Sequence, residues 1–307
     1  MDIVHLEHEL HFPTTFQGES FVLALGFFDG MHLGHQRILC TARAIAALNK
    51  CKLAVMTFDP HPEEVLQSRP SPFPYLSSLQ ARVEAFEKQG VDTLFIVKFT
   101  KAFSALSPKA FVDRYMLGLR VIHVVAGFDF TFGYKGAGNM ERLRELSLGL
   151  FAVTALDKMA HANQKISSTV IRNLLGAGEV RQIPEFLGDY YETRGVIIAT
   201  VPRIQLSYRK VRIVTEGECL LPKHGVYKVQ TKVEERWYDG ICLVKAQSGQ
   251  EAEEKNLDVQ LLGCSENLHG KAVKVRWMEY ILDKDNREIK RSKDQEGDKY
   301  ALRKLSL

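Results

Sequence analysis

The sequence predicts an α/β protein in which a Rossmann-like, doubly wound parallel sheet is followed by a small antiparallel β-barrel. Two observations favour this fold class. From residue 20 to about 176, short runs rich in Val, Ile, Leu and Phe alternate with longer segments that carry apolar residues at helical spacing. After residue 188 the helical spacing ends, and short strand-like runs follow with Gly, Asn and Asp between them. We therefore expect two domains, residues 1–188 and 189–307.

The apolar runs of the first domain are expected to be buried strands joined by helices. The expected strands are residues 21–28, 53–58, 93–99, 121–126 and 150–155. The expected helices are residues 36–48, 79–89, 108–117 and 139–148. Strands that are apolar along their length and alternate with helices are typical of a parallel sheet covered on both faces. Ligands of such sheets bind outside the carboxyl ends of the strands, so we expect a site at that edge.

The second domain is expected to contain six short strands. They are residues 195–201, 210–215, 225–231, 237–244, 257–262 and 271–280. Regularly spaced short strands with turn residues between them are typical of a small barrel. The segment 283–299 is dense in charges of both signs and is expected to be a solvated tail.

The composition argues against several classes of function. Of the 307 residues, 45% are hydrophobic and 25% are charged, and the net charge of +4 is shared by both halves, so no nucleic-acid partner is indicated. No run approaches the roughly 18 apolar residues that cross a bilayer, so no membrane partner is expected. The five cysteines form no Cys-x-x-Cys pair and the first residues do not resemble a signal peptide; both favour a reducing, cytoplasmic location.

The stretch between the first expected strand and the first expected helix reads Gly-Phe-Phe-Asp-Gly-Met-His-Leu-Gly-His. A glycine-bearing turn from a strand into a helix presents backbone N–H groups to phosphate oxygens. Two imidazoles one helical turn apart, His32 and His35, would lie beside the same anion. A zinc site on this pair is the weaker alternative, because neither a Cys pair nor an HExxH glutamate lies nearby. The other candidate binding residues are Gly26, Phe27, Phe28, Asp29, Gly30 and Gly34.

A second motif, Thr-Phe-Asp-Pro-His-Pro at residues 57–62, directly follows an expected strand. Its two prolines predict a stiff turn. Phe58, Pro60 and His61 are then either parts of a rigid loop or an apolar wall for a flat ring. The sequence leaves both interpretations open.

A third motif, Ala-Gly-Phe-Asp-Phe-Thr-Phe-Gly at residues 126–133, also leaves an expected strand. The carboxylate of Asp129, two residues after Gly127, would accept a hydrogen bond from a ribose hydroxyl or an adenine amine. The phenylalanines around it are expected to belong to the core.

A fourth motif, Lys-Ile-Ser-Ser-Thr-Val-Ile-Arg at residues 165–172, precedes an apolar helical pattern. One hydroxyl before a helix is an ordinary N-cap. Three in a row exceed what a cap requires. Ser167, Ser168, Thr169 and the guanidinium of Arg172, with the N–H groups of the helix start, predict a second phosphate grip.

In this order and spacing, and with the segment 99–108, the four motifs resemble the nucleotidyltransferase module of bacterial riboflavin kinase/FAD synthetases. The resemblance covers roughly residues 15–188. It implies an HxGH nucleotidyltransferase that transfers AMP from ATP, accompanied by Mg²⁺, to FMN and forms FAD and pyrophosphate. The resemblance assigns His32 and His35 to the ATP phosphates, and the Ser-Ser-Thr run and Arg172 to the second phosphate-binding motif. It assigns Asp129 to the adenosine part of ATP. Phe58, Pro60 and His61 fall in the loop near the flavin. Val170 departs from the family, which commonly has Arg there.

The second half resembles the riboflavin kinase barrel of the same family at residues 221–227 and 256–271. Where the family has a Pro-Thr-Ala-Asn motif, residues 202–211 read Pro-Arg-Ile-Gln-Leu-Ser-Tyr-Arg-Lys-Val. The missing Thr and Asn would supply oxygen ligands for Mg²⁺ and the ATP phosphates. Asp258 stands where the family has a catalytic Glu and is one methylene shorter. These two departures imply that the barrel no longer phosphorylates riboflavin.

The sequence therefore predicts an FMN adenylyltransferase with His32, His35 and Arg172 as catalytic residues, ATP and FMN as substrates, and no metal ligands of its own. Three alternatives remain. One is a bifunctional enzyme with a kinase site rebuilt from Ser207, Thr215 or Asp258. The others are an adenylyltransferase with a different acceptor phosphate and a non-catalytic flavin-binding regulatory protein. Assembly into a homo-oligomer is left open.

Overall fold

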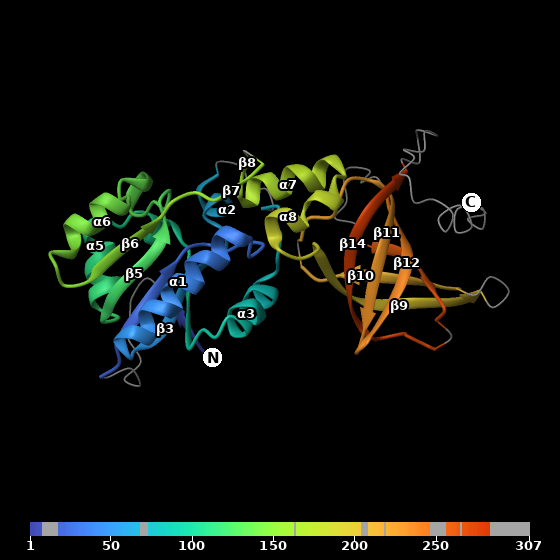
Figure 1. Ribbon diagram of the computed structural model, residues 1–307, viewed down its shortest axis with the longest axis horizontal. Helices are drawn as coiled ribbons and strands as arrows, with labels where there is room; N and C mark the ends of the chain where they lie inside the picture. Colours follow the sequence, from blue (N-terminus) through green and yellow to red (C-terminus); the bar gives the residue numbers. More distant parts are fainter. Residues whose placement is uncertain are drawn as a thin grey trace. The chain divides into compact units, whose positions relative to one another are not determined.

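The computed structural model describes residues 1–7, 18–67, 73–162, 164–203, 208–217, 219–245, 256–264 and 266–282. The chain divides into two compact units, Met1–Ser168 and Thr169–Leu307 (Figure 1). The first unit contains a six-stranded parallel sheet and the second a closed six-stranded antiparallel barrel. The predicted fold class is therefore confirmed. The expected tail 283–299 and residues 204–207, which include Ser207, lie outside the described residues.

The sheet of the first unit has the strand order β1-β4-β3-β2-β5-β6. Its strands are β1 (Asp2–Leu6), β2 (Phe21–Leu25), β3 (Lys52–Asp59), β4 (Thr93–Lys98), β5 (Val121–Gly127) and β6 (Ala152–Leu156), and all neighbours are parallel. Because β2 lies between β3 and β5, the strand order reverses beside it. In open parallel sheets, the carboxyl ends at such a reversal form the ligand-binding crevice.

Helices cover both faces of this sheet, and the four expected ones are present. They are α1 (Leu33–Asn49), α3 (Leu79–Lys88), the joined α5 (Pro108–Phe111) and π-helical η2 (Val112–Leu117), and α6 (Met140–Ser147). Shorter elements complete the unit: α2 (Pro62–Leu66), α4 (Lys101–Ser104), η3 (Tyr134–Gly136), β7 (Ala160–His161) and β8 (Gln164–Lys165). The two faces have separate apolar cores. Val22 and Ala24 of β2 pack on the α1 side, whereas Leu23 and Leu25 pack on the other, which explains why the whole strand is apolar.

The structure corrects two predictions for the sheet. The expected strand 21–28 ends at Leu25, because the chain turns at Gly26 and Phe28 adopts a left-handed φ of 60°. Strand β1 was not expected at all. It is an edge strand on which only Leu6 is buried, so it lacks the apolar run by which the other strands were recognised.

The second unit begins with α7 (Ser168–Ala177), whose first residue belongs to the first unit. The short helices η4 (Val180–Gln182) and α8 (Pro184–Leu187) follow. Its barrel strands are β9 (Glu192–Arg203), β10 (Tyr208–Thr215), β11 (Gly225–Val233), β12 (Arg236–Val244), β13 (Asn256–Leu262) and β14 (Ala272–Leu282), in the closed order β10-β13-β12-β11-β14-β9. All six expected strands are present. The expected domain boundary at residue 188 stays a prediction.

Buried residues alternate along the barrel strands, as an apolar interior requires. On β10, for example, Arg209, Val211, Ile213 and Thr215 are buried and the residues between them are not. The indole of Trp277 is enclosed, and its Nε1 donates a hydrogen bond to Thr193 Oγ1 at 2.8 Å. In the described parts of both units, no helix combines the length and hydropathy that crossing a membrane demands.

Candidate active site

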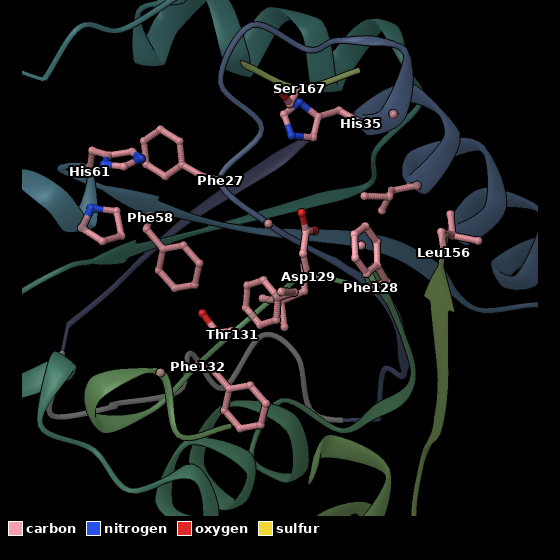
Figure 2. Close-up of a pocket in the computed structure, with 18 of the residues that line it drawn as sticks. Phe27, His35, Phe58, His61, Phe128, Asp129, Thr131, Phe132, Leu156 and Ser167 are labelled. Carbon is pink, nitrogen blue, oxygen red and sulfur yellow. The ribbon is translucent and has the colours of Figure 1, made fainter. Parts of the chain in front are cut away.

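The first unit has a cavity of about 990 Å³ at the carboxyl ends of β2 and β5 (Figure 2). Residues of all four sequence motifs line it: Gly26, Phe27, His32, Gly34, His35, Phe58, His61, Gly127, Asp129 and Ser167. The two most distant motifs thus share one cleft. The parallel sheet explains this meeting, because each motif directly follows a strand end or precedes a helix at the same edge.

His32 caps the helix that enters the cavity wall. It is the N-cap residue of α1, and its Nδ1 accepts a hydrogen bond from the backbone N–H of His35 at 3.2 Å. A neutral imidazole whose Nδ1 is an acceptor carries its proton on Nε2. His32 therefore offers an N–H donor to an anion at the positive end of the α1 dipole.

The two histidines lie against each other. Their ring centroids are 3.6 Å apart and the ring planes differ by 14°. Burial lowers the pKa of His32 from 6.5 to about 4. Burial, followed by the neighbouring His32, also lowers the pKa of His35 well below its ordinary value. Both rings are thus neutral near pH 7.

Gly34 lies between the histidines, where a larger residue would crowd the His32 ring. A Cβ at this position would come within 3.1 Å of Nδ1 and Cε1 of His32. The glycine therefore permits the cap that orients the His32 ring. Its backbone φ is not in the left-handed region, so the requirement is one of space and not of conformation.

The carboxylate of Asp29 is buried and does not line the cavity, although it was expected to bind a ligand. It is 2% exposed and accepts hydrogen bonds from the backbone N–H groups of Leu76 and Ser77 and from the Ser77 hydroxyl. Gly30 follows with φ 77° and donates its N–H to Ser77 Oγ at 3.0 Å. These residues hold the chain before α3 against the motif and do not line the cavity.

Of the remaining expected site residues, some are in the first unit but do not line the cavity, and the others are in the second unit. Phe28 is fully buried and packs on Phe86, with His35 5.2 Å from its ring. Pro60 is half-buried between two lining residues. Ser168 does not line the cavity, but its hydroxyl donates to the backbone oxygen of Asp29 at 2.8 Å and so ties the fourth motif to the first. Thr169 and Arg172 follow on α7, in the second unit, and their roles stay predictions.

One side of the cavity is aromatic. Figure 2 shows Phe27, Phe58 and His61 together on this side, whereas His35 and Ser167 lie on another. The His61 ring stacks on the Phe73 ring, with the ring centroids 3.4 Å apart, and lies edge-on to the Phe27 ring, with the centroids 4.3 Å apart. His61 is also held by the hydroxyl of Tyr75, which accepts its backbone N–H at 2.8 Å. We call Phe27, Phe58 and His61 the aromatic wall.

Asp129 lines the cavity, and its half-exposed carboxylate is already paired. The ammonium of Lys165 is 2.6 Å from its Oδ2, and the same ammonium lies 5.3 Å from the centroid of the exposed Phe128 ring. The expectation for the phenylalanines of this motif was only partly right. Phe132 is buried in the core, but Phe128 is 41% exposed and lines the cavity.

Sequence reasoning gave no role to several polar residues of the cavity. Arg37, Thr131 and Lys165 all line it. Lys165 opens the fourth motif, and Arg37 follows His35 by two residues, so their proximity to motif residues was the available signal. Thr131 offered no signal beyond its place among the phenylalanines.

The described residues contain no group of three or more His, Cys, Asp or Glu side chains that would hold a metal ion. The absence of a metal site on His32 and His35 stays a prediction.

In the second unit, Asp258 is enclosed by two cations. Its Oδ1 is 3.0 Å from Arg212 Nε and its Oδ2 is 3.0 Å from Lys245 Nζ. Burial raises the pKa of this carboxyl, but the hydrogen bonds and charges of Lys245 and Arg212 outweigh it and the net pKa is lowered. Thr215 is another residue considered for a rebuilt kinase site. It lies three positions after Arg212 on β10 and is buried, whereas Arg212 is exposed, so the two side chains project to opposite sides of the barrel wall.

Comparison with known proteins extends over both units. Residues 15–170 match the family model of FAD synthetase, and residues 187–290 match that of riboflavin kinase. The chain is 35% identical to a bifunctional riboflavin kinase/FMN adenylyltransferase of Bacillus subtilis, over 92% of this chain and 90% of the relative. It is 37% identical to the protein of that name from Listeria monocytogenes, over 89% and 88%.

Two further comparisons concern a shorter relative and a solved structure. An FAD synthetase of Listeria monocytogenes is 32% identical over 57% of this chain and 72% of its own length. A crystal structure of a Streptococcus pneumoniae chain, described as a macrolide-efflux protein, superposes with a TM-score of 0.83 at 25% identity and covers 98% of this chain and 97% of that one. The matches to both family models and to full-length relatives lead to one conclusion: the chain belongs to the riboflavin kinase/FAD synthetase family.

Proposed function

We propose that this chain is an FMN adenylyltransferase that transfers AMP from ATP to FMN and releases FAD and pyrophosphate. The observation that carries the proposal is that a capped histidine pair, a serine motif and an aromatic wall line a single cavity at the switch point of the sheet. A polar side that suits phosphates and an aromatic side that suits a flat ring are what this reaction requires. Membership of the family supports the same assignment.

In the proposed reaction a phosphate oxygen of FMN attacks the α-phosphorus of ATP, and the bond to the pyrophosphate oxygen breaks. The protein supplies no nucleophile, so its contribution is positioning and neutralisation of charge. Nε2–H of His32 and the N-terminus of α1 would donate to the phosphates. Mg²⁺ enters as part of the MgATP substrate and offsets the charge of the triphosphate.

We assign the other site residues according to the side of the cavity on which they lie. His35 and Ser167 would contact the phosphates. Ser168, Thr169 and Arg172 belong to the same sequence motif as Ser167, and we assign them to phosphate binding on that ground. Asp129 would accept from adenosine after Lys165 releases it. The aromatic wall and Pro60 would hold the flavin. Asp29 and Gly30 would support the loop before α3 in place of a direct contact.

We further propose that the barrel has lost riboflavin kinase activity. A general base must have a carboxylate that is available to the hydroxyl proton it removes. Asp258 is instead held by Arg212 and Lys245, which lower its pKa and make it a weaker base. A bifunctional enzyme is the second candidate, favoured by the match to the riboflavin kinase family model and by the bifunctional relatives.

One chromatographic assay tests these proposals. The protein is incubated with MgATP and either FMN or riboflavin, and flavin products and pyrophosphate are measured. We expect FAD and pyrophosphate in equal amounts from FMN, and neither FMN nor FAD from riboflavin. His35→Ala should lower the rate of FAD formation by about 10² to 10³, the typical effect of removing one preorganised donor.

Each contrary result selects another function. FMN formed from riboflavin would establish the bifunctional enzyme. Flavin binding without pyrophosphate release would favour a regulatory protein, and pyrophosphate release only with another phosphate compound would change the acceptor. An unchanged rate in His35→Ala would remove that residue from the mechanism.

A further inference from the structure

Arg82 is an arginine in the interior of the first unit, close to the cavity but not in contact with its lumen. It lies on α3 and is 1% exposed. Moving a guanidinium out of water is costly unless it is hydrogen-bonded and paired. A long apolar side chain would fill the same space on the inner face of α3 at a lower cost. The partners of Arg82 should therefore explain why it is there.

These partners are the carboxyl ends of two adjacent strands. Nη1 of Arg82 donates to the backbone oxygen of Phe27 at 3.2 Å and to Thr57 Oγ1 at 3.1 Å, and it is 3.5 Å from the backbone oxygen of Phe58. Nη2 is 3.6 Å from the carboxylate of Asp59. Thr57 in turn donates its hydroxyl to Phe27 at 2.9 Å. One side chain thus ties the turn after β2 to the end of β3.

Arg82 also contacts the ring of a cavity residue. Its Cζ lies 4.5 Å from the centroid of Phe27, a cation–π distance. The Phe27 ring in turn contacts the ring of His61, and the two ring centroids are 4.3 Å apart. The guanidinium therefore fixes the backbone of Phe27 and Phe58 and the ring of Phe27, and through that ring it supports His61. These three residues are the aromatic wall.

We propose that Arg82 is a positioning residue for the acceptor: it holds the aromatic wall at the distance that a flat acceptor ring requires and does not touch the reacting atoms. The inference rests on the proposed FMN adenylyltransferase activity. The contacts given above all lie at the ends of β2 and β3, whereas the histidine pair is held by its own cap on α1. The direct supports of the aromatic wall therefore differ from the cap of the histidine pair, and the two meet only where Phe28 contacts the His35 ring among the contacts described above.

Steady-state kinetics with FMN and MgATP varied separately tests this separation. Arg82→Met keeps most of the side-chain volume and removes every hydrogen bond. We expect KM for FMN to rise by about tenfold, while KM for ATP and kcat stay within about twofold. Arg82→Lys, which keeps the charge and one or two donors, should recover part of the KM for FMN.

A second variant and a matched control separate positioning from folding. Thr57→Val removes the hydroxyl between Arg82 and Phe27 without changing the shape of the side chain, and should raise KM for FMN by about threefold. In the double variant the two effects should not multiply, because both act on the same link. Arg43→Met is the control: Arg43 is exposed on α1, donates to the backbone oxygen of Gln89, and does not line the cavity.

The results decide between distinct failures. Wild-type protein that makes no FAD would remove the proposed function, and this inference with it. If the wild type is active, an unchanged KM for FMN in Arg82→Met, or equal rises in both KM values, would overturn the role of Arg82 alone. If circular dichroism shows Arg82→Met to be unfolded, Arg82→Lys and Thr57→Val carry the test, and an unchanged KM for FMN in both overturns the proposal.

Discussion

At the scale of single residues, the properties of the site come from burial as much as from residue type. His32 is 8% exposed and its pKa is lowered to about 4, so the folded protein holds this ring neutral. The unfolded chain protonates it near pH 6.5. Between pH 4 and pH 6.5 the unfolded state therefore binds more protons at this residue than the folded state does. The free energy of unfolding is consequently highest above pH 6.5 and decreases as the pH falls towards 4.

A pH-dependent stability follows from this difference. From about pH 7 to about pH 5, His32 should reduce the free energy of unfolding by roughly 2 kcal/mol. His32→Gln keeps an acceptor for the cap and cannot titrate, so its loss over the same range should be smaller by about that amount. Urea unfolding of both proteins at the two pH values measures the effect. Equal losses would mean that the ring is not held neutral in the folded state.

Residue type allowed the sequence to place several residues at the cavity, and their roles stay predictions. His32, His35 and Ser167 all line it, because the motifs that contain them lie at the same edge of the sheet. Asp29 was expected to bind a ligand, and its carboxylate is instead fully engaged with the chain at Leu76 and Ser77. No local pattern distinguishes these two uses of an Asp, because the partner is 47 residues away.

At the scale of elements, the N-terminus of α1 shows how a glycine is selected by its neighbour. A Cβ at Gly34 would press on the His32 ring, which caps the helix. The glycine at position 176 of α7 is the opposite case, since a Cβ there would meet nothing within 4 Å and its φ is not left-handed. Both glycines are in α-helices, so the intrinsic gain from alanine applies to each.

This pair gives a matched test. Gly176→Ala should raise the free energy of unfolding by about 0.5 to 1 kcal/mol and leave FAD formation unchanged. Gly34→Ala should gain little or no stability, because the lost cap offsets the propensity, and should lower the rate of FAD formation by about tenfold or more through the displaced His32. Thermal unfolding and the FAD assay measure both. Full activity in Gly34→Ala would show that the cap is not needed for catalysis.

The elements themselves were predictable where their apolar pattern was strong. The five expected strands of the sheet and the six of the barrel are all present. Strand β1 was missed because an edge strand with one buried residue has no such pattern. The π-helical turn η2 lies inside an expected helix, since apolar periodicity does not distinguish a local change in hydrogen-bond spacing.

At the scale of the whole molecule, chain topology brings together what the sequence separates. The position of β2 between β3 and β5 places the ends of three strands beside one cavity, and the expected parallel sheet was sufficient to predict that meeting. The long-range contacts of Arg82, which we propose to hold the aromatic wall, were not predictable. Two of its partners are backbone oxygens, which every residue type presents equally, and the others, Thr57 and Asp59, are more than 20 residues away in the sequence.

The two units also divide the proposed chemistry, and Asp258 tests the division. If adenylyl transfer takes place in the first unit and the barrel has no kinase activity, Asp258→Asn should leave FAD formation from FMN within about twofold of the wild type. It should cost about 1 kcal/mol of stability, because Arg212 and Lys245 are about half exposed and water solvates them when the carboxylate is removed. Asp239→Asn, on the exposed side of β12 beside Gln230, is the matched control.

The decisive measurement offers riboflavin and FMN in parallel to the wild type and to both Asp→Asn variants, with product analysis and urea unfolding. We expect no FMN from riboflavin in any of the three proteins, because the carboxylate at 258 is a weakened base even when present. Phosphorylation of riboflavin by the wild type and by Asp239→Asn, and its loss in Asp258→Asn alone, would instead make Asp258 a working base. Arg212 and Lys245 would then be groups that release it when substrate binds, and the barrel would be a second active site.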